Sequence, residues 1–354
     1  MIPRKARRDT RRIAVAAANP VACLLLVLLG SCRGPSPQKP EPAPAPAARV
    51  WPLPPAEPRV KWVGQIATPA DFGLRVSFLT RMGNFLTGGD RGREKLIKPF
   101  GLALDEAGNL CVTDTGANAV YFFDLAHRRS QRWTQIGGLA LISPVAVAKR
   151  TGLVYVADSG LRSVLVADEK GRLRHQIKEG LERPSGLALS GEKLYVADAG
   201  AHCVLIFDLE GRPLGRFGAR GVAPGEFNFP THVATDAQGR VYVTDAMNSR
   251  VQVFDGEGHF LREIGSLGDG SGYFSRPKGV AVDRLGQIYV TDALFDNVQI
   301  FDPEGRFLLD FGSAGPLHGE FWMPAGIVIG ADNLIYVADS YNGRIQIFQT
   351  IGQP

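Results

Sequence analysis

The sequence lacks a hydrophobic run long enough to cross a membrane comfortably. A transmembrane helix needs about 20 consecutive, mostly apolar residues. The densest apolar stretch covers only Val21 to Leu29, and Asn19-Pro20 interrupts the weaker run that begins at Ile13. Because a basic segment comes directly before this stretch, we interpret it as the central region of an export signal.

Cysteine and the common catalytic motifs are also scarce. The 354 residues include four cysteines, and Cys111 and Cys203 lie in strand-like segments far apart in the sequence. They belong to the first and third of the six repeated units described below, which are too distant for a disulfide bond, so we expect both to act as small buried hydrophobic side chains. The sequence contains no Gly-x-Ser-x-Gly nucleophile elbow, which disfavours a hydrolase of that type.

The chain after residue 58 lacks an excess of charge of either sign. The whole sequence has 40 basic and 35 acidic residues and a formal charge of +5. Nine of the basic and three of the acidic residues precede residue 59, which leaves 31 and 32 for the remainder. A nucleic-acid-binding domain needs a basic surface, so we predict no nucleic-acid partner.

What the sequence does contain is a motif that occurs six times, with Pro277 to Asp302 as a representative copy. Each copy starts at a proline and reaches Tyr-Val-x-Asp, or a close variant, 14 or 15 residues later. Successive aspartates are 44, 40, 47, 47 and 47 residues apart, and they are Asp114, Asp158, Asp198, Asp245, Asp292 and Asp339. A period of this size is typical of propeller blades.

Each copy shows the alternation of four half-buried strands. In the representative copy, apolar residues alternate over 280–282, 288–290 and 298–300, and Phe307 to Phe311 adds a fourth segment. Glycine, proline, asparagine and aspartate mark the turns between them. Six four-stranded sheets arranged radially form an all-β, six-bladed β-propeller.

The ends of the chain predict how the ring closes. The sixth copy ends at Phe348 without a fourth strand, and Arg59 to Ile66 resembles the fourth strands of other copies. We therefore predict that this N-terminal strand completes blade six and covers the exposed sheet edge.

A short helical insertion is expected before blade one, within residues 67–98. Its apolar residues have the spacing of one helix face, and they are Leu74, Phe78, Leu79, Met82, Phe85 and Leu86. We interpret this helix as a cover packed on the propeller, with a lid or docking element as the alternative.

The motif resembles the NHL repeat. The resemblance rests on Pro-x-Gly-[Leu/Val]-Ala-[Leu/Val]-Asp, then [Ile/Val]-Tyr-Val-[Ala/Thr]-Asp, then Asn-x-Arg-[Val/Ile]-Gln-[Val/Ile]-Phe. The clearest copies of the last part are Asn248 to Phe254 and Asn342 to Phe348, and the resemblance covers Arg59 to Phe348. It implies a six-bladed propeller, but one fold hosts many unrelated functions.

The first 58 residues indicate export and tethering. Residues 1–31 are interpreted as a lipoprotein signal peptide, because Leu29-Gly30-Ser31-Cys32 resembles the bacterial lipobox, which implies a lipid anchor on Cys32. The alternative is an ordinary signal peptide with an incidental cysteine. Residues 32–58 are rich in proline and alanine and are predicted to act as a semi-rigid tether, leaving 59–354 as the propeller. This places the protein on a bacterial membrane, at the periplasmic face or the cell surface.

The six repeated aspartates are predicted to be structural. A residue that every blade requires is most simply a turn-former whose carboxylate accepts backbone N–H bonds. Ligand binding is instead expected where the copies differ. The loops that enter each first strand and those that join second to third strands should meet on one face. There we predict a binding face with Phe100, Lys278, Phe295, Trp322 and Tyr341.

The leading functional hypothesis is a monomeric, non-enzymatic module that binds a protein, peptide or glycan of the cell envelope. The alternative is a metal-dependent lyase or hydrolase similar to the amidating lyase and lactonase propellers. The resemblance to the amidating lyase would require histidines directly after the repeat prolines, and this sequence has none there. We therefore predict no catalytic residues, no metal ligands and no cofactor; a divalent metal in the central channel belongs to the alternative.

Overall fold

The computed structural model describes residues 49–68, 71, 95–124, 127, 129–150 and 152–352. They belong to one compact unit, which spans Ala47–Pro354. The predicted helical insertion at 74–86, the signal peptide, Cys32 and most of the tether lie outside the described residues. Within the described ranges, no helix is long and apolar enough to cross a membrane.

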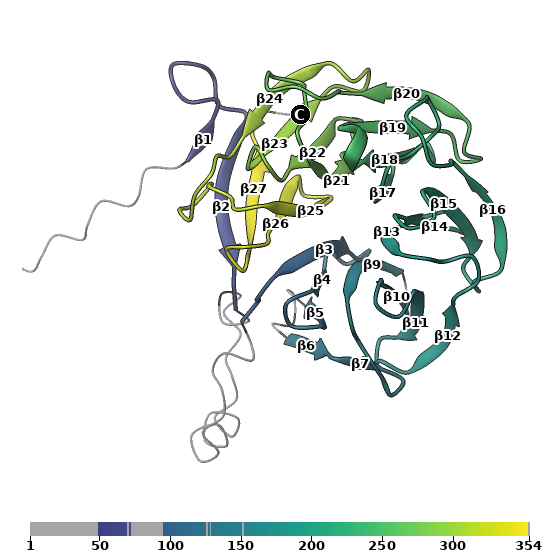
Figure 1. The fold of residues 1–354 in the computed structure, drawn as a ribbon. Helices are drawn as coiled ribbons and strands as arrows, with labels where there is room; N and C mark the ends of the chain where they lie inside the picture. Colours follow the sequence, from purple (N-terminus) through teal and green to yellow (C-terminus); the bar gives the residue numbers. More distant parts are fainter. Residues whose placement is uncertain are drawn as a thin grey trace, which may run out of the picture. The chain divides into compact units, whose positions relative to one another are not determined.

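Four-stranded antiparallel sheets follow one another around a ring (Figure 1). Blade one comprises β3 (Pro99–Leu104), β4 (Leu110–Asp114), β5 (Ala119–Asp124) and β6 (Arg129–Trp133). Blade two comprises β9 (Pro144–Arg150), β10 (Leu153–Asp158), β11 (Ser163–Asp168) and β12 (Leu173–Ile177). A small hairpin between these blades comprises β7 (Gln135–Ile136) and β8 (Leu139–Ala140). Blade three comprises β13 (Pro184–Ser190), β14 (Lys193–Asp198), β15 (Cys203–Asp208) and β16 (Pro213–Phe217).

The second half of the ring repeats the same order of strands. Blade four comprises β17 (Pro230–Thr235), β18 (Val241–Asp245), β19 (Arg250–Phe254) and β20 (Phe260–Ile264), with the 3₁₀ turn η3 (Ala246–Asn248) after β18. Blade five comprises β21 (Pro277–Val282), β22 (Ile288–Asp292), β23 (Asn297–Phe301) and β24 (Phe307–Phe311). Blade six contributes β25 (Pro324–Ile329), β26 (Leu334–Asp339) and β27 (Arg344–Thr350). The prediction of an all-β, six-bladed propeller is confirmed.

An N-terminal strand completes blade six, as predicted. Strand β2 (Val60–Ile66) pairs antiparallel with β27, so the purple and yellow ends of the chain lie side by side in Figure 1. Strand β1 (Val50–Trp51) adds a short fifth strand outside β2. The folded structure thus begins earlier than the expected boundary at Arg59. The reason is that the Trp51 ring packs on the rings of Phe311 and Phe348, with centroids 6.0 and 5.7 Å apart.

Neighbouring blades are held together by buried aromatic side chains. Phe227, Phe274 and Phe321 are fully buried, and each packs in a core shared by two consecutive blades. The tyrosine of the Tyr-Val-x-Asp motif faces the next blade in the same way. Because a single blade has an apolar surface on both sides, stacking around the ring buries both.

The glycine of Pro-x-Gly is explained by the crowding of the innermost strands. A Cβ atom on Gly101 would lie 2.5 Å from the carbonyl oxygen of Val145 in the next blade, and one on Gly279 would lie 2.5 Å from that of Ala325. A side chain cannot fit at such distances. The six innermost strands surround a channel of about 300 Å³ that is lined mainly by aliphatic residues and includes His232.

Candidate functional site

The loops that enter the first strands and the loops that join second to third strands lie on one face of the ring. In every blade, a backbone N–H just after the motif aspartate donates to a carbonyl in the segment before the repeat proline. In blade six, for example, the Tyr341 N–H donates to the Trp322 carbonyl at 3.1 Å. These bonds join the entry loop and the second-to-third loop into one unit per blade. We call the surface formed by the six units the mouth face.

Four of the motif aspartates hold these units with four backbone hydrogen bonds each. The carboxylate of Asp114 is fully buried and accepts N–H bonds from Ile97, Lys98, Gly116 and Ala117 at 2.7 to 3.0 Å. Equivalent sets surround Asp158, Asp198 and Asp292. A carboxylate that accepts several backbone donors fixes both loops of its blade.

The aspartates of blades four and six differ from the other four, although we predicted the same role for all six. Asp339 accepts one backbone N–H, from Trp322, and side-chain bonds from Asn342, Arg344 and Gln346. The Arg344 Nε lies 2.7 Å from the Asp339 carboxylate, and both side chains are nearly inaccessible. Blade four repeats the arrangement with Asp245, Asn248, Arg250 and Gln252.

Trp322 and Tyr341 form an exposed aromatic pair on the mouth face. Their ring centroids are 5.7 Å apart, and the side chains are 56% and 49% exposed. Lys98 joins them from blade one, with its Nζ 3.2 Å from the Tyr341 hydroxyl and 4.4 Å from the ring centroid. A cation over an aromatic face is stabilising, so this cluster presents one defined surface.

Lys278 and Phe100 lie at the channel mouth, directly after their repeat prolines. The Lys278 Nζ is 6.0 Å from the Phe100 ring centroid. Burial, followed by repulsion from Arg276, Arg183 and Lys98, lowers the pKa of Lys278 below its ordinary value. A lysine held among like charges gains from an anionic partner, so the mouth is suited to a carboxylate or another anion.

Phe295, the fifth predicted residue, is half-buried, and its backbone N–H donates to Asp292. Part of its side chain packs inside the protein, so less of it is available to a ligand. The structure shows further exposed apolar side chains in the same two kinds of loop. With Trp322 and Tyr341, these are Ile97, Ile142, Phe229, Met247 and Leu294, all between 38% and 56% exposed.

Sequence reasoning missed the cationic contribution of the residues directly before the repeat prolines. These positions hold Lys98, Ser143, Arg183, Phe229, Arg276 and Met323, so three of the six are basic. In the sequence, Lys98 follows other basic residues closely, a pattern that is typical of a solvated loop. Comparing the residue before each proline, as well as the residue after it, would have revealed the cluster.

A shallow cavity of about 470 Å³ extends the mouth face between blades two and three. Its lining includes Ser159, Arg162, Glu182 and Arg183. Two guanidinium groups and one carboxylate at the same groove leave a net positive charge. The cavity thus continues the basic character of the channel mouth.

Three histidines, His202, His232 and His318, occupy separate surroundings. The His318 ring stacks on that of Trp62 in β2, with ring centroids 4.2 Å apart. The Nδ1 atom of His202 accepts a hydrogen bond from the Phe229 N–H at 3.3 Å. His232 lines the channel, where burial lowers its pKa to about 4. Among the residues the structure describes, no three His, Cys, Asp or Glu side chains are arranged to hold a metal ion.

Comparison with known families agrees with the geometry of the blades. A model described as the NHL repeat matches residues 181–207, 274–301 and 321–348, and one described as a 6-bladed beta-propeller matches residues 234–287. The chain is therefore a six-bladed β-propeller built of repeats. Three of its blades match the NHL repeat. No curated protein shows significant sequence similarity to it.

Solved structures share the fold at low sequence identity. A streptogramin B lyase aligns over 72% of this chain and 94% of its own, with 12% identity and a TM-score of 0.55. Hydrazine synthase of Kuenenia stuttgartiensis aligns over 75% and 99%, with 14% identity and a TM-score of 0.53. A protein of unknown function from Bacteroides thetaiotaomicron aligns over 74% and 72%, with 17% identity and a TM-score of 0.56. At such identities the similarity shows the fold alone.

Proposed function

We propose that this protein is a non-enzymatic binding module of the bacterial cell envelope, and that its mouth face binds a protein, peptide or glycan. The observation that carries the proposal is the exposed aromatic pair Trp322–Tyr341 beside Lys98. Large exposed apolar side chains gathered on one face mark interaction sites. Aromatic and basic residues are the types most enriched in binding surfaces.

The charges around the channel mouth favour an acidic partner. Burial and, after it, the charges of Arg276, Arg183 and Lys98 lower the pKa of Lys278. A partner segment with carboxylates next to apolar side chains would neutralise these charges and cover the aromatic pair. Complementary charge also speeds association at low ionic strength.

The test is to select peptides from a random display library on the immobilised full-length protein. We expect enrichment of peptides that combine acidic and apolar residues. The double variant Trp322→Ala/Tyr341→Ala should weaken their binding at least about tenfold, because truncating an aromatic anchor costs about 2 kcal/mol or more. Lys278→Ala should weaken binding and reduce its dependence on salt.

Matched controls are available on the outer strands. Leu214 and Leu261 are 55% and 48% exposed and lie in β16 and β20, away from the mouth face. The double variant Leu214→Ala/Leu261→Ala should bind like the unchanged protein. Equal losses in both double variants, or selected peptides without acidic residues, would count against the proposed face.

The proposed membrane anchor is tested separately. Cys32→Ser should abolish incorporation of radiolabelled fatty acid and leave an uncleaved or soluble precursor. Several acyl chains on one cysteine would hold the protein much more firmly than a single chain does. Unchanged labelling of the variant would show that another residue carries the lipid, or that the lipobox reading is wrong.

The enzymatic alternative stays a prediction. Its support is the resemblance of the fold to that of lyases, and a fold shared at 12% identity transfers no chemistry. Metal analysis of the purified full-length protein is its direct test. A stoichiometric divalent metal would favour the alternative over the binding module.

A further inference from the structure

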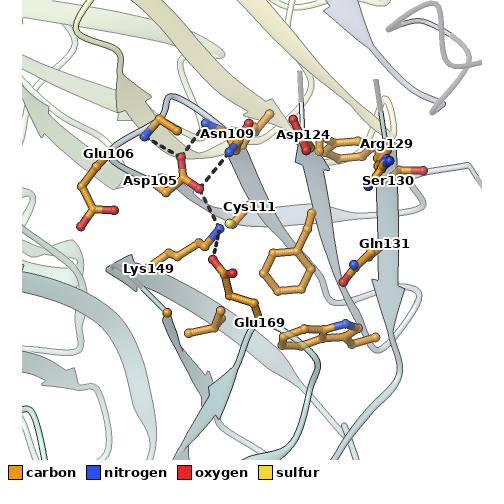
Figure 2. Close-up of a pocket in the computed structure, with 17 residues that line it drawn as sticks. Asp105, Glu106, Asn109, Cys111, Asp124, Arg129, Ser130, Gln131, Lys149 and Glu169 are labelled. Carbon is orange, nitrogen blue, oxygen red and sulfur yellow. Dashed lines mark hydrogen bonds and ion pairs between the residues drawn. The ribbon is translucent and has the colours of Figure 1, made fainter. Parts of the chain in front are cut away.

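A cavity of about 660 Å³ opens between blades one and two, at the strand ends opposite to the mouth face (Figure 2). Its volume lies in the range of pockets that accept small molecules. One side carries Asp105, Lys149 and Glu169, and the other combines aromatic side chains with Asp124, Arg129 and Gln131. The mouth-face proposal does not involve any of these residues.

The cavity lies where blade one departs from the motif. In the other blades the first residue of Tyr-Val-x-Asp is a tyrosine buried against the next blade, and these are Tyr155, Tyr195, Tyr242, Tyr289 and Tyr336. Blade one has Cys111 at this position. A cysteine side chain is shorter than a tyrosine by a whole phenol ring. The space between blades one and two is consequently less filled than the other interfaces.

The tyrosines of the other blades show which acceptors a hydroxyl group at this place would bind. The hydroxyls of Tyr242 and Tyr289 donate to the first-turn aspartates of their own blades, Asp236 and Asp283, at 3.0 and 3.1 Å. The position of this aspartate corresponds to Asp105 in blade one.

A second acceptor position belongs to the third turn of the following blade. The Tyr195 hydroxyl donates to the Gly256 carbonyl at 2.9 Å, and the Tyr155 hydroxyl donates to the Leu209 carbonyl at 3.2 Å. The corresponding residue next to blade one is Glu169, whose backbone carbonyl takes the place of these acceptors. Asp105 and Glu169 both line the cavity.

Lys149 has taken over part of the role of the missing hydroxyl. Its Nζ lies 2.7 Å from the Asp105 carboxylate and 3.1 Å from that of Glu169, so it bridges the two carboxylates and occupies the first acceptor position. The equivalent residues in the other innermost strands are uncharged, and they are Leu104, Leu189, Thr235, Val282 and Ile329. The cavity is also lined by Glu106, Asp124 and Arg129, so its charged side chains are four carboxylates and two cations. The net negative charge disfavours an anionic ligand.

The opposite wall is aromatic only in blade one. Cys111 pairs with Phe122 across β4 and β5, and Phe122 pairs with Gln131 of β6. Val166, Ile206, Val253, Ile300 and Ile347 occupy the position of Phe122 in the other blades. The Phe122 ring packs on Trp133 with centroids 4.2 Å apart. Because burial raises the pKa of Cys111 to about 12, its thiol stays protonated and forms a neutral part of the floor.

We propose that this cavity binds a small phenol. The ring would lie against Phe122 and Trp133, and its hydroxyl would donate to the carboxylate of Asp105 or Glu169. The ligand would thus supply the phenol group that is part of a tyrosine side chain in the other five blades and is missing in blade one. Cavities left by missing core side chains bind small molecules of matching shape.

The probe that tests this proposal is p-cresol, the side chain of tyrosine itself. Titrations of the full-length protein, followed by ligand-observed NMR, should show saturable binding. Toluene, which lacks the donor, should bind about tenfold more weakly, since a hydrogen bond to a charged acceptor is lost. The anion 4-methylbenzoate should bind more weakly still. Equal binding of all three compounds, or no saturable binding of p-cresol, would overturn the proposal.

Two variants locate the binding. Cys111→Tyr should fill the cavity from within and weaken p-cresol binding at least about tenfold, whereas Cys111→Ala should retain it. Gln131→Trp changes an exposed side chain at the rim and should block the entrance even if the tyrosine variant fails to fold. If both blocking variants bind p-cresol like the unchanged protein, the ligand lies elsewhere and the inference is wrong.

Discussion

A chain that begins at Ala67 is expected to lose the cooperative fold and to aggregate. Deleting β2 removes Val60 and Ile66, each 1% exposed, and each worth about 1.5–3 kcal/mol of burial. It also removes Trp62, whose indole donates to Gln346 at 3.1 Å. Since domains of this kind are stable by only about 5–15 kcal/mol, the loss of a whole strand takes away much of that margin.

The same strand connects two blades, which makes its removal more damaging. Val60 packs in the core shared by blades five and six, and Ile66 packs in the core shared by blades six and one. Without β2, strand β27 presents unpaired backbone groups that another chain can pair with. Light scattering should therefore rise with protein concentration in the truncated chain.

Two further chains separate closure from general damage. A chain that begins at Arg59 lacks β1, the Trp51 contacts and the ion pair of Arg49 with Glu320, and its thermal unfolding should shift modestly. A synthetic peptide of residues 59–66 should restore a cooperative transition to the chain that begins at Ala67. Equal melting temperatures for chains that begin at Arg49 and at Ala67 would show that the N-terminal strand does not close the ring.

The architecture could be predicted because it is repeated. Each blade carries the same period-two alternation and the same aspartate, so six weak signals reinforce one another. The closing strand was identifiable because the sixth copy lacks a fourth strand. The two-residue strand β1 has no such signal, since it depends on a tertiary contact of Trp51 with Phe311 and Phe348.

The sites were harder to predict, because they depend on side chains that meet across blades. Trp322 and Tyr341 could be selected as exposed loop residues, but the contact of Lys98 with Tyr341 joins positions 243 residues apart. The cavity had a sequence signal in the cysteine that replaces the motif tyrosine. That this cysteine lies at a cavity could be seen only in the structure, which places Lys149 of the next blade between Asp105 and Glu169.

The replacement Arg344→Met is expected to destabilise the protein by about 3–5 kcal/mol, the usual cost of leaving one buried charge without its partner. Arg344 contacts the Asp339 carboxylate, and its Nη2 donates to the carbonyls of Leu317 and Glu320, both at 2.8 Å. Methionine keeps the length of the apolar stem but satisfies none of these acceptors. Urea unfolding followed by circular dichroism measures the change in the free energy of unfolding.

Arg306→Met provides the matched control. Arg306 also pairs with an aspartate, Asp302, but its side chain is 76% exposed. Exposed ion pairs contribute about 0–1 kcal/mol, so this variant should unfold almost like the unchanged protein. The double variant Arg344→Met/Asp339→Asn should recover part of the lost stability, because it no longer buries an unpaired charge.

The pH dependence distinguishes an unpaired charge from a packing defect. Burial already raises the pKa of Asp339, and loss of the guanidinium should raise it further. The folded variant would then bind a proton that the unfolded chain releases, so its stability relative to the unchanged protein improves as the pH falls toward this pKa. The difference in unfolding free energy should therefore be smaller at pH 5 than at pH 7. A difference that is the same at both pH values, or one no larger than that of Arg306→Met, would show that Arg344 does not act by neutralising Asp339.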